Sequence, residues 1–198
     1  MDRVTKEGQM TKYKVILADC PWKYSDKRKN DPGYAGITYD VMSTKDLCSL
    51  PVKEIADKDC MLFMWATSPM LPDCLEIMKA WGFKFKTVAF VWEKLNTRSG
   101  TPVSLMGRFT MGSCEYVLVG TKGHPQRVSK NVRQLVQAKR AGHSVKPKDV
   151  HNRIVELCGD VPRVELFARD TVEGWDCIGN GIDGKDIRDV LEEKRNQE

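Results

Sequence analysis

The sequence predicts an α/β protein in which a mostly parallel, twisted sheet carries helices on both faces. Short apolar runs rich in β-branched residues alternate along the chain with segments of helical periodicity. The 198 residues include 41% hydrophobic residues and carry a net charge of +5, which suffices for a buried core and excludes intrinsic disorder. No apolar run approaches the roughly 20 residues that span a bilayer.

Buried strands are expected where continuous apolar runs end at a polar residue or a turn signal. The predicted strands are Tyr13–Ala18, Cys60–Thr67, Lys84–Trp92, Glu115–Gly120 and Arg163–Ala168. In open sheets of this kind ligands bind beyond the carboxyl ends of the strands. The residues that directly follow each strand are therefore the candidates for a functional site.

Four helices are predicted between and after these strands. They are a short helix from Ser43 to Leu50, then Pro72–Trp81, Pro147–Cys158 and the polar Lys185–Arg195. Ser43 and Asp46 form a capping box, and Gly82 and Gly159 end the second and third helices. Apolar residues at helical spacing predict the buried faces of these two, namely Leu75, Met78 and Trp81 and then Val150, Ile154, Val155 and Cys158.

The chain is expected to form a single domain over residues 1–198, with a core over 13–182 and a polar C-terminal tail or helix over 183–198. A polar start without a signal-peptide apolar region predicts a cytoplasmic protein with no membrane partner. The seven cysteines are odd in number and form no CxxC pair, so a disulfide framework is not expected. Cys60, Cys74 and Cys158 are expected to be small buried hydrophobes. The histidines lack metal spacing, and no metal site is predicted.

Charge is distributed unevenly. Thr121–Arg153 holds nine basic residues and one acid, a net charge of +8, whereas the segment from Asp176 to the end has a net charge of −3. A second small basic cluster lies within Lys23–Lys29. Such asymmetry indicates a polyanion partner such as nucleic acid. A solvated surface on a mildly basic protein explains the charge alone equally well.

The most informative strand end is Asp19-Cys20-Pro21-Trp22, directly after the first strand. Pro21 fixes its own φ and favours an extended Cys20. This arrangement aims the Asp19 carboxylate and the Cys20 carbonyl at one point beside the Trp22 ring. Two acceptors and a stacking plane are what an exocyclic amino group on a flat base requires. The alternative interpretation is a β-turn with a core Trp.

This tetrapeptide resembles the D-P-P-W signature of adenine-N6 methyltransferases. The chain is similar, more narrowly, to the family that includes the catalytic subunit of the eukaryotic mRNA adenosine methyltransferase and many bacterial and phage relatives. Further blocks of that family follow in its order, and the resemblance covers Lys14 to Ile182. They are ITYDVMS (37–43), LFMWAT (62–67), FVWEK (90–94), EYVLVGTKGHPQ (115–126), HSVKPKDVHNRIVEL (143–157), RVELFAR (163–169) and GWDCIGN (174–180). The resemblance implies a Rossmann-like methyltransferase fold with a permuted motif order.

The permuted order places the base-handling motif first and the cofactor-binding strand late. It explains why no Gly-rich fingerprint follows the first strand, as a nicotinamide dehydrogenase would require. By resemblance the cofactor is S-adenosyl-L-methionine. The residues that the resemblance assigns to it are Lys146 for the carboxylate, Glu165, Phe167 and Arg169 for the ribose side, and Asn180 with Gly181 for the ribose or adenine end.

The sequence departs from the family pattern in three places. Cys20 stands where Pro is usual in the family. The function that the resemblance implies for this position belongs to its backbone carbonyl, which any residue supplies. Asp170–Val172 follow Arg169 in place of the His and Asn that contact the ribose in eukaryotic members, so further ribose contacts stay unassigned. Met1–Lys12 holds no assignable equivalent of an upstream acidic residue that contacts the adenine moiety.

The expected reaction is direct displacement at the sulfonium methyl by the adenine N6 amine. Asp19 and the Cys20 carbonyl would accept the amine hydrogens, and the adjacent indole would stack on the base, worth about 1–3 kcal/mol. Tyr39, Trp92 and Lys94 are candidates for the substrate pocket, although both aromatic residues would serve equally well in the core. An adenine in duplex DNA would first have to be flipped out.

DNA is the favoured substrate, because the compact chain encodes no RNA-binding accessory domain and suits a bacterial or phage DNA modifier. RNA is the first alternative. An alternative of another class is a catalytically inactive methyltransferase-like scaffold that binds nucleic acid beside an active partner. Such scaffolds lose the Asp or the cofactor Lys, both of which are present here as Asp19 and Lys146. The expected oligomeric state is a monomer or a homodimer.

Overall fold

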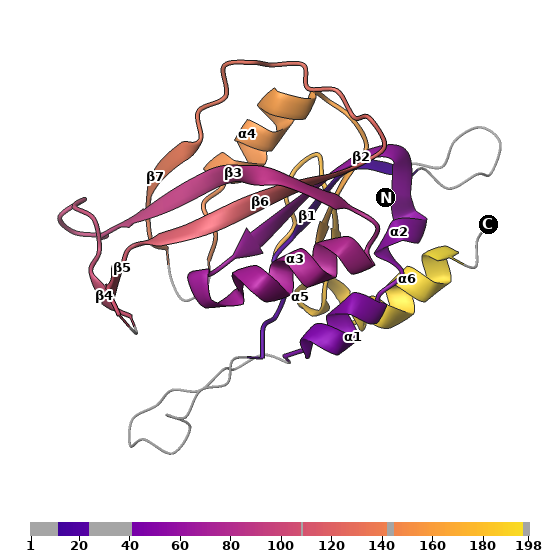
Figure 1. Cartoon of the computed structure of the whole chain (residues 1–198), viewed down its shortest axis with the longest axis horizontal. Helices are drawn as coiled ribbons and strands as arrows, with labels where there is room; N and C mark the ends of the chain where they lie inside the picture. Colours follow the sequence, from indigo (N-terminus) through magenta and orange to yellow (C-terminus); the bar gives the residue numbers. More distant parts are fainter. Residues whose placement is uncertain (1–11, 24–40, 108, 142–144, 196–198) are drawn as a thin grey trace.

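The computed structural model describes residues 12–23, 41–107, 109–141 and 145–195, and its centre is a seven-stranded sheet (Figure 1). In spatial order the strands are β7 (Leu135–Lys139), β3 (Lys84–Leu95), β6 (Cys114–Lys122), β2 (Ala56–Ala66), β1 (Tyr13–Ala18), β8 (Arg163–Leu166) and β9 (Asp176–Ile178). Non-consecutive neighbours in this order show that the chain crosses over the sheet repeatedly. The predicted α/β class is confirmed.

One strand of this sheet, β6, is antiparallel to both of its neighbours, and every other neighbouring pair is parallel. The prediction of a mostly parallel sheet is therefore confirmed. Because β6 is reversed, its amino end lies at the edge where β1, β2 and β3 end. We call this the carboxyl edge, and it gathers residues from both kinds of strand end.

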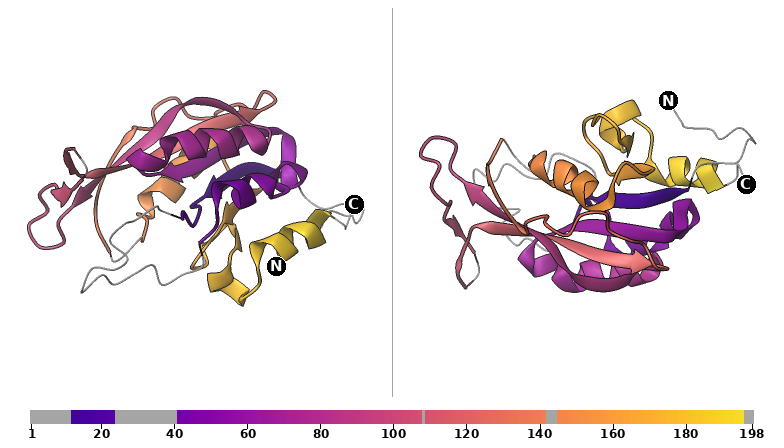
Figure 2. Two further views of the ribbon diagram at one scale, coloured as in Figure 1. Left: turned by 60° about the horizontal axis from the view of Figure 1, so that its bottom comes forward. Right: turned by 90° about the horizontal axis from the view of Figure 1, so that it is seen from above.

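Helices cover both faces of the sheet, as the sequence predicts (Figure 2). One core cluster joins a face of the sheet to α1 (Thr44–Ser49), α2 (Val52–Ile55), α3 (Leu71–Ala80) and α6 (Ile187–Arg195), and the other face packs against α4 (Asp149–Cys158). Two short elements, η2 (Ser68–Met70) and α5 (Asn180–Asp183), follow β2 and β9. Among the described helices, none is long and apolar enough to cross a membrane.

The continuous apolar run of β2 reflects burial on both faces. Leu62 and Met64 pack into the cluster that contains α3, whereas Phe63 and Trp65 pack into the cluster that contains α4. Burying a large apolar side chain stabilises the fold by about 1.5–3 kcal/mol, so both faces favour apolar residues. Alternation is absent from the strand sequence for this reason.

The predicted helix boundaries hold closely at α1 and α3. The Ser43 hydroxyl accepts a hydrogen bond from Asp46 N at 3.1 Å, as the capping box predicts. α3 ends at Ala80, followed by Gly82 with a φ of 82°. Its expected buried face is wrong at Leu75, whose exposed fraction is 42%. Cys74, Ile77 and Met78 form the buried face instead, together with the C-cap Trp81.

Several elements were not predicted from the sequence. They are α2, η2, α5, β7, β9 and a two-stranded hairpin made of β4 (Leu105–Met106) and β5 (Met111–Gly112). The helix predicted from Pro147 begins at Asp149, so Lys146 lies in the segment that precedes it. Cys60, Cys74 and Cys158 are buried as expected, and burial raises the pKa of the Cys74 and Cys158 thiols to about 12.

Candidate active site

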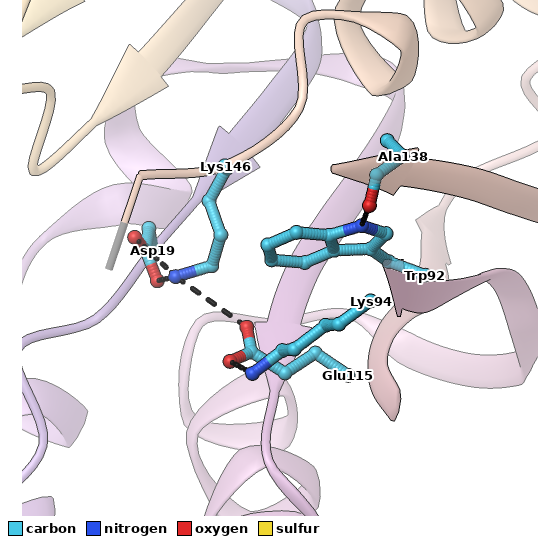
Figure 3. A network of polar contacts seen from close by, with 6 residues as sticks. All are labelled: Asp19, Trp92, Lys94, Glu115, Ala138 and Lys146. Atoms are coloured by element: carbon cyan, nitrogen blue, oxygen red, sulfur yellow. Dashed lines mark hydrogen bonds and ion pairs between the residues drawn. The ribbon is translucent and has the colours of Figure 1, made fainter. Parts of the chain in front are cut away.

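Four charged side chains meet at the carboxyl edge (Figure 3). Asp19 follows β1, and Lys146 Nζ lies 2.9 and 2.8 Å from its two carboxylate oxygens. Lys146 Nζ also lies 3.6 Å from Glu115 Oε2, near the start of β6. Lys94 Nζ, near the end of β3, donates to Glu115 Oε1 at 2.5 Å. Two carboxylates and two ammonium groups therefore form one network, which we call the edge network.

The edge network is largely withdrawn from solvent, with side-chain exposures of 14 to 17%. Burial raises the pKa of Asp19, and the positive charges of Lys146 and, more weakly, Arg169 oppose this rise. Burial alone would lower the pKa of Lys146, but Asp19 and Glu115 outweigh it, so that pKa is raised. Lys146 is thus a well-paired cation and not an exposed first-turn residue.

The rest of the D-x-P-W tetrapeptide is less open than Asp19. Cys20 is buried, and burial raises the pKa of its thiol, so the thiol is not a nucleophile. The Pro21 carbonyl accepts a hydrogen bond from Met42 N at 2.9 Å. Trp22 is 5% exposed and belongs to the core cluster that contains α3, the position that the β-turn interpretation expects. A base could stack on this indole only if its neighbours moved.

Two tryptophans of the core cluster that contains α4 lie directly beside the edge network. Trp92 is buried, and its Nε1 donates to Ala138 O at 3.0 Å, which ties β3 to β7 (Figure 3). Trp65, at the end of β2, meets the Trp92 ring edge-on with centroids 6.1 Å apart. The Lys94 and Lys146 ammonium groups lie 5.2 and 5.4 Å from the Trp92 and Trp65 ring centres, within cation–π range. Tyr39 lies outside the described residues.

The residues that the resemblance assigns to the cofactor come together only in part. A Cβ on Gly181 would lie 2.7 Å from Arg169 O, so the chain after β9 packs closely against the chain after β8. Phe167, the residue directly after β8, has a φ of 63°. Glu165 points instead toward α4, where its Oε2 lies 2.7 Å from His151 Nε2. The Asn180 side chain lies outside the described residues.

The sequence analysis assigned no functional role to three residues at or near the site. Glu115 reaches the carboxyl edge because β6 is reversed, which a strand's sequence does not encode. Trp65 stood at a predicted strand end without an assigned role, and its buried Nε1 lacks a hydrogen-bond partner among the described residues. His151 pairs with Glu165 across 14 residues of sequence, from a helix to a strand.

The first part of the predicted basic stretch lies far from Asp19. Lys122 ends β6 at the opposite edge of the sheet, where its Nζ donates to Lys53 O and Ala56 O, both at 3.0 Å. Arg127 and Lys130 follow on an exposed loop beside the carboxyl end of α4. Lys122, Arg127 and Lys130 therefore lie away from the carboxyl edge and the edge network.

The stretch returns to the carboxyl edge with β7. Lys139 and Arg140 are exposed there, and Arg140 N donates to Leu95 O at 3.2 Å, at the end of β3. Of the second basic cluster, Lys23 is exposed and the residues after it lie outside the described ones. Lys139 and Arg140 are thus the exposed cations of β7 and its end that lie on the side of Asp19.

The chain is similar to known proteins over a range that includes these site residues. The MT-A70 family model matches residues 13–181. The type II methyltransferase M.MunI of Mycoplasma sp is 37% identical over 197 residues, which covers 90% of this chain and 82% of that protein. The human N(6)-adenosine-methyltransferase catalytic subunit METTL3 is 25% identical over 186 residues, which covers 90% of this chain and 30% of that protein.

A third relative carries a different description. The N6-adenosine-methyltransferase non-catalytic subunit MTB of Arabidopsis thaliana is 30% identical over 120 residues, which covers 59% of this chain and 15% of that protein. The family match, in contrast, extends from β1 past Asp19, Glu115 and Lys146 to Gly181. With its whole carboxyl edge inside that match, this chain belongs to the MT-A70 family of adenine-N6 methyltransferases.

Proposed function

We propose that this protein transfers a methyl group from S-adenosyl-L-methionine to the N6 amine of adenine in DNA. The observation that carries the proposal is the contact between Asp19 of the D-x-P-W motif and Lys146 of the S-V-K-P segment. The two residues lie 127 positions apart in the chain, in a family of adenine-N6 methyltransferases. The proposed acceptor for the amine and the proposed cation for the cofactor therefore lie side by side.

The residues at the carboxyl edge fit the proposed cofactor by their chemistry. S-adenosyl-L-methionine carries a carboxylate and two cationic centres, and the edge network offers the Lys146 ammonium together with two carboxylates. Gly179 and Gly181 pack closely against the backbone of Ala168 and Arg169, which holds together the two chain segments that the resemblance assigns to the ribose. When bound, the cofactor supplies a methyl group made electrophilic by its sulfonium.

Asp19 is the proposed hydrogen-bond acceptor for the N6 amine. The N6 lone pair is delocalised into the ring, and accepting an amine hydrogen at Asp19 favours the pyramidal nitrogen from which the new N–C bond forms. The amine must lose one proton, and the raised pKa of Asp19 makes this carboxylate a better proton acceptor than an exposed Asp. Lys146 holds both oxygens of that carboxylate and so fixes its orientation.

The proposed choice of DNA is supported by the match to M.MunI, since the type II designation belongs to DNA-modifying enzymes. RNA adenosine is the alternative substrate, because METTL3 and its relatives also match. A second candidate function is an inactive nucleic-acid-binding scaffold, which the similarity to the non-catalytic subunit MTB favours. Asp19 and Lys146 are both present and paired, and this retention supports catalysis over the scaffold.

The test is transfer of labelled methyl from S-adenosyl-L-methionine to DNA and RNA of matched sequence. We expect incorporation into DNA, digestion to yield N6-methyladenine, and loss of the signal in Asp19→Ala. Asp189→Ala, at an exposed acid on α6, is the matched control and should keep wild-type activity. Labelling of RNA alone would assign the alternative substrate. Binding of nucleic acid without labelling of either would assign the scaffold.

A further inference from the structure

The β4–β5 hairpin projects from the end of the sheet where β3 ends and β6 begins (Figures 1 and 2). It lies in the connection from β3 to β6, and the chain on either side of the hairpin is hydrogen-bonded to one residue of β3, Lys94. Lys94 N donates to Ser113 O at 2.8 Å, and Val103 N donates to Lys94 O at 2.9 Å. Lys94 is also the residue whose ammonium pairs with Glu115. The position of the hairpin is therefore coupled to the residues around Asp19.

The hairpin exposes an apolar surface that the two core clusters do not use. Met106 is 92% exposed, Phe109 91%, Met111 58% and Leu105 39%. We call these four residues the hairpin tip, and none belongs to either core cluster of the described residues. Concentrated exposed apolar side chains on a soluble fold mark a binding surface.

The charge around the hairpin tip favours a polyanionic partner. The segment from Leu95 to Cys114 contains two basic residues, Arg98 and Arg108, and no acid. At the base of the hairpin the exposed Lys139 and Arg140 add two more positive charges. A second copy of this chain carries a net charge of +5 and lacks complementarity to such a surface, whereas a phosphate backbone has it.

The chemistry of the hairpin tip matches a recurring device of DNA-binding proteins. Phe, Leu and Met side chains are inserted as apolar wedges between base pairs, where they unstack and kink the duplex. An enzyme that modifies a base in duplex DNA must rotate that base out of the stack. A wedge next to the flipped base offsets part of the unstacking cost, because it replaces lost base contacts with apolar ones.

We propose that the hairpin tip enters the base stack of duplex DNA next to the target adenine and helps to hold the adenine outside the helix. Arg98, Lys139 and Arg140 contact the flanking phosphates. This inference rests on the proposed methylation of DNA and adds the element that opens the duplex. It assigns to Met106 and Phe109 a role in the methylation of duplex DNA, and methylation of single-stranded DNA does not need this role.

The test compares unmethylated DNA of high sequence complexity in duplex form with the same DNA after heat denaturation. The variant is Met106→Ser combined with Phe109→Ser, and the matched control is Val128→Ser, at a site 69% exposed on the loop beside α4. We expect the double variant to lose at least tenfold in methyl transfer to duplex DNA. Its transfer to denatured DNA should stay within twofold of wild type, and the control should match wild type on both.

Other outcomes overturn the inference, and they can be distinguished from a failure of the proposed function. Suppose that the wild type is active and the double variant loses methyl transfer to duplex and denatured DNA equally, or loses neither. The hairpin tip then has no role in opening the duplex. Sedimentation that shows a wild-type dimer and a monomeric double variant would assign the hairpin tip to self-association. If the wild type labels neither form, the proposed function fails, and fluorescence anisotropy of duplex and single-stranded oligonucleotides decides the hairpin alone. An unchanged duplex affinity in the double variant then overturns the inference.

Discussion

Lys146 Nζ contacts both carboxylate oxygens of Asp19, at 2.9 and 2.8 Å, across 127 positions of the chain. The pair joins the end of the first strand to the segment that precedes α4. The family resemblance implies a different ligand group for each residue, the adenine amine for Asp19 and the cofactor carboxylate for Lys146. Their contact means that substitution of either one changes the charge state and the orientation of the other.

Substitution of Asp19 separates its role in chemistry from any role in binding. Asp19→Ala removes the proposed acceptor for the amine, so we expect methyl transfer below a hundredth of wild type. Cofactor affinity, measured by isothermal titration calorimetry, should change only a few-fold, because Lys146 remains. Methyl transfer above a hundredth of wild type in the folded variant would show that Asp19 is not the essential acceptor.

Cys20→Pro tests whether this position acts through its backbone. Proline keeps the carbonyl, suits an extended chain and matches the usual family residue, and the Cys20 thiol is buried. We expect the rate of methyl transfer to stay within about threefold of wild type. If a folded Cys20→Pro protein is inactive, the thiol or the local backbone of this chain matters more than the carbonyl.

The pH dependence should shift in opposite directions in two variants. The proposed mechanism needs the ionised Asp19, so activity should be lost as pH falls through the pKa of Asp19, which burial raises above the ordinary Asp value of 3.8. Lys146 lowers this pKa and Glu115 raises it. The acid limb of kcat/KM should therefore move to higher pH in Lys146→Gln and to lower pH in Glu115→Gln. If the acid limb moves in the same direction in both variants, Asp19 is not the titrating group.

The division of the basic stretch between two edges gives a test of the DNA-binding side. Lys139→Gln with Arg140→Gln should weaken DNA binding at every sequence and reduce the slope of log K against log salt by roughly 0.9 per lost duplex contact. Arg127→Gln with Lys130→Gln removes the same charge at the other end of the molecule and should leave the slope unchanged. Anisotropy titrations at several salt concentrations measure both. The reverse result would place the DNA on the loop beside α4.

Gly181→Ala tests the close packing of the chain after β9. The added Cβ would lie 2.7 Å from Arg169 O and 2.8 Å from Arg169 Cα, so one backbone segment must move. We expect a destabilisation of about 1–3 kcal/mol and a cofactor affinity at least tenfold weaker. Gly112→Ala, where the nearest atom would lie 3.8 Å from the new Cβ, should change neither. Thermal unfolding and calorimetry read the two effects separately.

The sequence predicted the parts of the fold that are written locally. β1 was predicted at its observed bounds, Tyr13–Ala18, because a continuous apolar run ending at Asp19 is a local signal. Ser43 and Asp46 predicted the start of α1 in the same way. β7 was missed because Leu135–Lys139 mixes exposed and polar residues and gains its strand form from pairing with β3.

The candidate site was predictable only where a motif was continuous in sequence. The family blocks supplied Asp19 and Lys146, but their contact depends on how β1 and the chain before α4 are brought together. Glu115 and His151 have no motif of their own, and each gains its partner from another element. Trp22 was expected to face a base, and its burial follows from packing around Met42 that no strand or helix pattern specifies.

The reversal of β6 has a consequence for how this fold can diversify. In a wholly parallel sheet the chain between two neighbouring strands must cross back over a face, so its length is constrained by the helix that packs there. Between β3 and β6 it instead turns around at the open end of the sheet, where Leu95 and Cys114 bound a segment whose described residues include one core residue, Val103. Residues can be added or removed there while the sheet stays intact. Exchange of this segment between related enzymes is therefore a direct route to altered substrate preference on an unchanged catalytic scaffold.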